Sequence, residues 1–143
     1  MKILNMVELT KTNYKNYIPL DIVALSFAEG GAQGCPGRIE IVTFDQKLYY
    51  FNHCFGDLDE HDIYSICPEL RECSFGPFRR NKIPAGWKYY YLGAGNHLTV
   101  SGRVYMEFDR IKGKDIEGVA LYQAWLDILF SAMKKNYDRA ENR

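Results

Sequence analysis

The chain has 143 residues, 47% of them hydrophobic and 25% charged, which is ordinary for one globular domain and excludes wholesale disorder. Its 18 basic and 18 acidic residues balance to a formal net charge of zero, so the basic excess of a nucleic-acid binder is missing and no nucleic-acid polymer is expected as a partner. Four cysteines are too few for a disulfide scaffold, whereas 11 tyrosines and 8 phenylalanines supply ring faces for a core, a ligand or an interface.

The first part of the chain is predicted to be a series of strands. Residues 3–9 form the first, and a short turn closed by Pro19 follows it. Residues 20–28 are almost continuously apolar and include β-branched side chains, which is typical of a central strand covered on both faces. Residues 39–44 and 48–53 flank a polar Asp-Gln-Lys turn and predict a hairpin.

The middle of the chain is less regular. Residues 56–62 are acidic and predict a solvated loop, and residues 62–67 fit one helical turn before a proline. Residues 68–86 contain three prolines and two glycines, which predicts an ordered but irregular excursion. Residues 87–92 and 98–100 are rich in aromatic and apolar side chains, and they indicate two further strands separated by a glycine turn.

The last part of the chain is predicted to be helical. Residues 103–111 fit helical spacing and, less well, a strand, whereas residues 115–137 form the clearest helix. Within residues 120–133 the polar side chains lie four residues apart, so that nearly the whole helix surface is apolar; they are Gln123, Asp127 and Ser131. Such a helix is either central to the domain or docked on another subunit, and we expect a homo-oligomer built partly on it.

Together these elements predict one α+β domain over residues 1–137, with a mainly antiparallel sheet of about five or six strands and the long apolar C-terminal helix packed on it. Residues 138–143 are expected to be a frayed polar tail. No apolar stretch reaches membrane-spanning length without a charge, and the first six residues lack the apolar core of a signal peptide. We therefore expect a cytoplasmic protein with no membrane partner.

Two glycine-rich segments, residues 29–37 and 93–97, each follow a predicted strand. Glycines cluster where φ is positive or where a ligand approaches the backbone closely, and their open N–H groups can hold an anion. A tyrosine face and an arginine guanidinium complement a phosphate attached to a planar ring. The predicted ligand-binding residues are Glu29, Gly30, Gly31, Arg79, Arg80, Tyr91, Asn96 and His97.

These residues favour a small non-enzymatic binding protein that sequesters or senses a nucleotide-like or other anionic planar small molecule. Ordinary turn chemistry explains the same glycines without a ligand, and an exposed basic turn explains the two arginines. The alternative function is a protein-interaction module, such as an inhibitor or immunity protein, that acts through a Tyr-rich surface. An enzyme ranks third, because no complete catalytic constellation is visible, and no cofactor is expected.

Metal and cysteine chemistry are weaker hypotheses. Histidines and cysteines gather in one stretch, but without the paired spacings of a zinc site; they are His53, Cys54, His61, Cys67 and Cys73. No metal is therefore expected. Cys35, with His97 as its base and Asn96 or an acid as the orienting group, suggests a cysteine hydrolase or transferase. However, Pro36 follows directly and keeps Cys35 from starting a helix as a nucleophile usually does. The acidic run at 57–62 lacks the spacing of a calcium-binding EF-hand loop.

Overall fold

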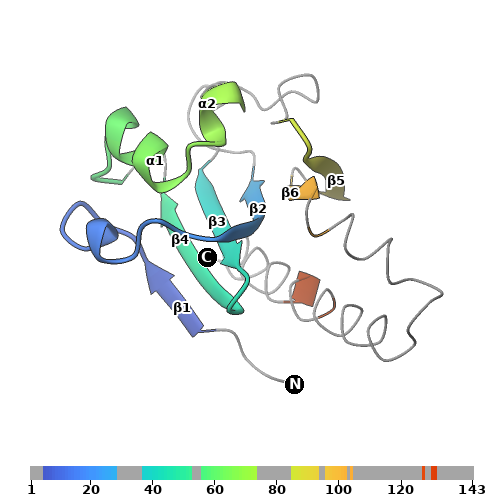
Figure 1. Ribbon diagram of the computed structural model, residues 1–143, viewed down its shortest axis with the longest axis horizontal. Coiled ribbons are helices and arrows are strands. Elements are labelled where there is room, and N and C mark those ends of the chain that lie inside the picture. Colours follow the sequence, from blue (N-terminus) through green and yellow to red (C-terminus); the bar gives the residue numbers. More distant parts are fainter. Residues whose placement is uncertain are drawn as a thin grey trace.

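The computed structural model describes residues 5–28, 37–52, 56–73, 85–93, 96–102, 104, 127, 130 and 131. A sheet forms its centre, and short helices lie beside it (Figure 1). The elements in chain order are β1 Asn5–Glu8, the short 3-10 helix η1 Tyr14–Asn16, β2 Ile22–Ala28, β3 Arg38–Thr43, β4 Lys47–Asn52, α1 Glu60–Ile66, α2 Leu70–Cys73, β5 Lys88–Gly93 and β6 Asn96–Val100.

The described strands form one six-stranded sheet in the order β1-β4-β3-β2-β6-β5. β1 pairs with β4 in parallel, with Val7 opposite Tyr49, and the other four pairings are antiparallel. The α+β class is thus confirmed, but the sheet is mixed rather than antiparallel. Parallel neighbours need a long crossover. Here it consists of residues 9–21, which contain η1 and are called the η1 segment below, followed by β2 and β3.

The long apolar helix expected at the C-terminus is not shown, because nearly all of residues 115–137 lie outside the described part of the chain. Asp127, Phe130 and Ser131 are helical; the Asp127 and Ser131 side chains are exposed and that of Phe130 is half-buried. Gly102 and Val104 are helical as well, at the start of the ambiguous segment. The tail at 138–143 is also outside the described residues.

β2 is the central strand of the sheet, as its apolar run predicts. Its neighbours are β3 and β6, and Val23, Ala24 and Leu25 are almost completely buried. One face of the sheet carries the main core, in which strand residues such as Leu25 pack with Ile63 of α1 and Leu70 of α2. The prediction of a strand covered on both faces is confirmed, because consecutive residues, which point to opposite faces, are all buried.

The predicted hairpin is confirmed as β3 and β4. Its turn is closed by a hydrogen bond from the backbone N–H of Gln46 to the carbonyl oxygen of Thr43, at 3.0 Å. Gln46 has a φ of 62°, in the left-handed region that side chains other than Gly, Asn and Asp rarely occupy. The turn therefore places Asp45 and Lys47 side by side, with 3.6 Å between the Lys47 Nζ and an Asp45 carboxylate oxygen.

The helical turn predicted at 62–67 is confirmed as α1, but the helix begins within the acidic residues 56–62, which were predicted to be a solvated loop. Asp59 caps α1: its carboxylate accepts the N–H of Asp62 at 2.8 Å, and the Asp62 carboxylate accepts the N–H of Asp59 at 3.2 Å. This reciprocal pair satisfies two N–H groups that the first helical turn leaves without partners. The helix therefore begins at Glu60, and Asp62 is buried. A second short helix, α2, interrupts the stretch predicted to be irregular.

Gly86, just before β5, and Gly102, just after β6, lie against each other. Gly86 has a φ of +82° and open space where a Cβ would be, whereas a Cβ on Gly102 would lie 1.7 Å from the carbonyl oxygen of Gly86.

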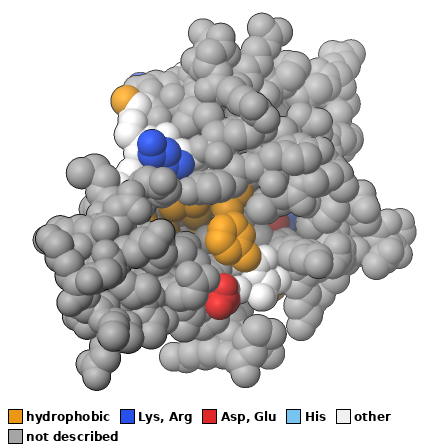
Figure 2. Space-filling model, turned by 90° about the vertical axis from the view of Figure 1, so that its right-hand side faces the viewer, with side chains coloured by type: hydrophobic (Ala, Val, Ile, Leu, Met, Phe, Trp, Pro, Cys, Tyr) orange, Lys and Arg blue, Asp and Glu red, His pale blue; other side chains and the backbone are white. Residues whose placement is uncertain are grey.

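Figure 2 shows the molecule from the β5 side, where described hydrophobic side chains lie between a basic and an acidic one. No helix in the described ranges has the length and apolar character to cross a membrane.

Candidate functional site

Backbone pairing brings together the strand ends that flank the two glycine-rich segments. β2 ends at Ala28, the last residue before the first segment, and Ala28 pairs with Asn96 of β6 on one side and with Arg38 of β3 on the other. Asn96 also pairs with Gly93, the last residue of β5. The ends of β2 and β5 and the beginnings of β3 and β6 therefore meet at one end of the sheet, here called the glycine end.

Three of the eight predicted ligand-binding residues have a described position at the glycine end. Asn96 is the first residue of β6, and the next residue, His97, pairs with Tyr91 of β5. His97 pairs on its other side with Phe27 of β2. The remaining five lie outside the described residues; they are Glu29, Gly30, Gly31, Arg79 and Arg80. Contact between the two glycine-rich segments stays a prediction.

Arg38 is a residue at the glycine end that the sequence reasoning missed. Its guanidinium carbon lies 3.9 Å from the centroid of the Tyr50 ring, and one of its nitrogens lies 4.0 Å from a carboxylate oxygen of Glu40. The Arg38 Nε–H is buried and has no hydrogen-bond partner among the described atoms. Arg38 pairs with Asn52, two residues from Tyr50, so the observed register of the hairpin places the two side chains on one face. The predicted hairpin began only at residue 39.

This arrangement gives Arg38 a fixed guanidinium plane. Stacking on Tyr50 is a cation–π contact, and the side chain keeps 24% of its surface exposed. The carboxylate of Glu40, with a side chain only 8% exposed, balances part of the charge. The buried Nε–H, without a partner among the described atoms, costs free energy.

A second polar cluster joins the η1 segment to α1. The Asp62 carboxylate accepts a hydrogen bond from Lys11 Nζ at 2.6 Å and another from the Tyr14 hydroxyl at 2.7 Å. The Lys11 bond is the main reason why the pKa of Asp62 lies far below its ordinary 3.8, and the same contacts raise the pKa of Lys11 and of Tyr14. All three groups thus keep their ordinary charge near neutral pH, which suits a structural clamp rather than proton transfer.

A hollow of about 330 Å³ lies at the other end of the sheet, where β3 turns into β4 and β2 begins. It is called the aromatic hollow below. Its lining combines rings, a hydroxyl and two carboxylates, from Tyr17, Pro19, Leu20, Asp21, Thr43, Phe44, Asp45 and Tyr49. The sequence reasoning did not find it, because the chain brings Tyr17 to Tyr49 only through the tertiary fold.

The cysteine and histidine hypotheses can be followed at two positions. His61 is exposed on α1, and Cys67 is buried, with its Sγ 3.3 Å from a carboxylate oxygen of Glu69. Within the described ranges, no three or more His, Cys, Asp or Glu side chains are grouped so that they could hold a metal ion. His53, Cys54 and Cys35 lie outside those ranges. No protein family, curated protein or solved structure matches the chain.

Proposed function

We propose that this protein is a non-enzymatic binding protein that holds a nucleotide-like or other anionic planar small molecule at the glycine end of the sheet. The observation that carries this proposal is the double pairing of Ala28 with Asn96 and Arg38. Because of it, the two residues that flank the first glycine-rich segment, Ala28 and Arg38, and Asn96 of the second are neighbours in the sheet. A ligand seated on one segment is then within reach of groups contributed by the other.

The chemistry of the glycine end suits an anion joined to a planar ring. Glycine N–H groups and the Arg38 guanidinium donate hydrogen bonds to phosphate or carboxylate oxygens. Arg79 and Arg80 are proposed to add further charge, and the ring of Tyr91 a stacking surface. The net charge of zero fits a local anion site better than a polymer. The proposed role is to sequester or sense the ligand.

Native mass spectrometry of protein purified from its own cells is the first test. It reports a retained small molecule and the number of subunits in one measurement, so it also examines the homo-oligomer expected through residues 120–133. Titration calorimetry with a panel of nucleotides and simpler phosphates then measures affinity. We expect one molecule bound per chain, with the phosphate-bearing members of the panel bound most tightly.

Paired variants locate the site. Replacing Arg79 and Arg80 together by Ala is expected to weaken binding by about 1.5–3 kcal/mol for each charged hydrogen bond lost, with folding intact. The matched control is Lys15→Ala with Lys88→Ala, which removes the same charge from two exposed lysines away from the glycine end. The proposal is refuted if both double variants weaken ligand binding equally. It is also refuted if no ligand is retained and no nucleotide binds at millimolar concentration. The protein-interaction module then becomes the better hypothesis.

A further inference from the structure

Two of the aromatic side chains that line the aromatic hollow are exposed. Tyr17 and Phe44 each keep 37% of their surface exposed, and with Met6 they are the large hydrophobic side chains exposed in the described part of the chain. The Tyr17 ring leans over the buried ring of Tyr49, with centroids 5.4 Å apart and planes inclined by 59°. Rings from the η1 segment, the β3–β4 turn and β4 thus converge on one cavity.

Both charged residues that line the hollow are acidic. Asp21 precedes β2, and Asp45 lies in the β3–β4 turn. The Asp45 carboxylate accepts a hydrogen bond from the Thr43 hydroxyl, which holds it at the rim. The Tyr49 hydroxyl has an ordinary pKa of 10.0, which burial raises further, and it adds no charge at neutral pH. The hollow therefore offers negative charge and electron-rich ring faces together.

We propose that the aromatic hollow binds a small organic cation of the alkylammonium class. A cation over an aromatic face gains about 0.5–2 kcal/mol, more where water is excluded, and carboxylates at the rim supply the opposite charge. The volume of about 330 Å³ lies at the lower end of the range for small-molecule pockets, which fits a compact ligand. This site is independent of the proposed function, because it lies at the opposite end of the sheet and selects the opposite charge.

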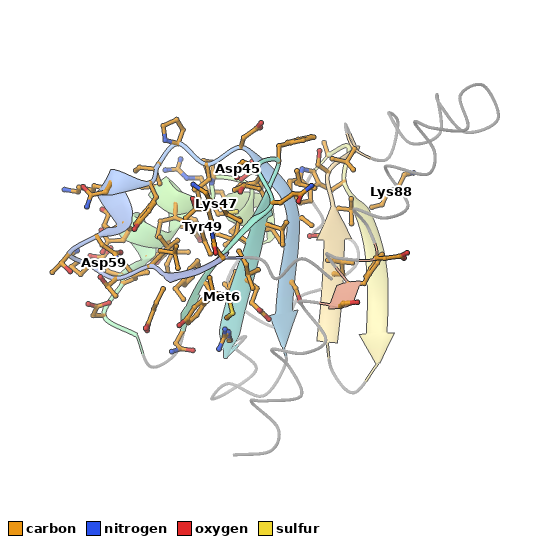
Figure 3. All side chains as sticks on the ribbon, turned by 90° about the horizontal axis from the view of Figure 1, so that it is seen from below. Met6, Asp45, Lys47, Tyr49, Asp59 and Lys88 are labelled. Atoms are coloured by element: carbon orange, nitrogen blue, oxygen red, sulfur yellow. The ribbon has the colours of Figure 1, made fainter. Side chains whose placement is uncertain are left out.

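Lys47 acts as an internal competitor for this cation. Its Nζ lies 3.6 Å from an Asp45 carboxylate oxygen, yet the side chain does not line the hollow. Figure 3 shows Asp45, Lys47 and Tyr49 close together at this end of the sheet, and Lys88 far from them at the β5 edge. A bound ammonium has to share the Asp45 carboxylate with Lys47, so removal of the lysine is expected to strengthen binding.

The test compares choline with its neutral isostere 3,3-dimethylbutan-1-ol, which has the same shape without the charge. In an NMR titration of the full chain, choline is expected to move the amide signals of residues 43–49 to saturation. The isostere is expected to bind about tenfold more weakly, because it lacks the cation–π and carboxylate attraction. Equal binding of the two compounds, or no saturable shift with choline, overturns the proposal.

Single substitutions at exposed positions then identify the groups responsible. Phe44→Leu removes a ring but keeps an apolar side chain, and it is expected to weaken choline binding several-fold, as is Asp45→Asn. Lys47→Gln is expected to tighten it several-fold. The control Lys88→Gln makes the same change in net charge at a distant exposed site. If Lys88→Gln tightens binding as much as Lys47→Gln, the attraction is a property of overall charge and the site is refuted.

Far-ultraviolet circular dichroism and a thermal midpoint for each variant show whether it has folded. Choline binding is also measured in the variant that replaces Arg79 and Arg80 by Ala. It is expected to be unchanged there, so that loss of the anion site and loss of the cation site are separate results. If choline binding fails in that variant while the fold is intact, the two ends of the sheet are not independent and the assignment of the cation to the aromatic hollow is wrong.

Discussion

The contact between Gly86 and Gly102 leads to a prediction in which two identical substitutions have unequal costs for different physical reasons. In Gly102→Ala, the new Cβ would lie 1.7 Å from the Gly86 carbonyl oxygen and 2.8 Å from its carbon. Real Cβ contacts essentially never fall below 3.0 Å. Because the obstructing atoms belong to the backbone, no side-chain rotation can relieve the overlap, and the strand end or the following segment has to move.

The cost of Gly102→Ala is that of forced overpacking, about 3 kcal/mol or somewhat more. In Gly86→Ala the new Cβ has no atom within 4 Å, so only the φ of +82° opposes it. That conformation costs a residue with a Cβ about 1–2 kcal/mol, which the lower entropy of the unfolded alanine chain partly offsets. The expected net loss at Gly86 is therefore about 1 kcal/mol.

Urea unfolding, followed by the fluorescence of the two tryptophans, measures both losses. With a slope of about 2 kcal/mol per molar urea, the Gly102 variant is expected to shift the midpoint by about 1.5 M and the Gly86 variant by about 0.5 M. Asparagine separates the causes, since it tolerates left-handed φ: Gly86→Asn should cost less than Gly86→Ala, and Gly102→Asn should not improve on Gly102→Ala. A Gly102→Ala loss no larger than that of Gly86→Ala would show the reasoning to be wrong.

Three further predictions concern stability. Gln46→Gly is expected to stabilise the protein by up to about 1 kcal/mol, because it removes a side chain from a φ of 62°; a lower urea midpoint would contradict this. The pKa of Asp62 is lower in the folded protein than its ordinary 3.8, so its ionised carboxylate stabilises the fold above that pH, and this stabilisation is lost on acidification. In Asp62→Asn, the free energy of unfolding should therefore fall less steeply from about pH 5 downwards. Ile63→Ala should cost about 2–5 kcal/mol, while His61→Ala, exposed on the same helix, should cost under about 0.5.

The elements with strong local signals were predictable from the sequence. The apolar run of β2 implied its central place, and the alternation around Asp45 implied the β3–β4 hairpin, because both signals lie within a few residues of chain. The parallel pairing of Val7 with Tyr49 was not predictable in this way. It depends on a crossover, and local patterns give neither the partner nor the direction of a strand.

The capping of α1 was missed because its polar residues have more than one local meaning. Asp59 and Asp62 occur in an acidic run that is typical of a solvated loop, and the usual capping box has Ser or Thr followed by Glu or Gln. Burial of Asp62 becomes favourable only because Lys11 and Tyr14 arrive from the η1 segment to bind its carboxylate. Such partners are fixed by tertiary structure alone.

The candidate sites, too, were predictable only where the signal lies within a short stretch of chain. Glycine patterns indicated both strand-flanking segments, and the pairing of Tyr91 with His97 lies within the predicted β5–β6 region. Arg38 was accessible to sequence reasoning through its diagonal relation to Tyr50, but only once the hairpin register was known. The aromatic hollow was not accessible, because its rings come from segments that are joined by neither a turn nor a periodic pattern.

The parallel β1–β4 edge also constrains the order in which the chain can complete its sheet during synthesis. β1 is made before β2 and β3, but its partner Lys47–Asn52 is made only after them. β2 and β3 can pair as soon as β3 emerges, whereas β1 has to wait for β4 and then close a long loop. Until that closure, the outer edge of β4 exposes unpaired backbone groups, so β1 serves as the strand that protects the newly made sheet from pairing with another chain.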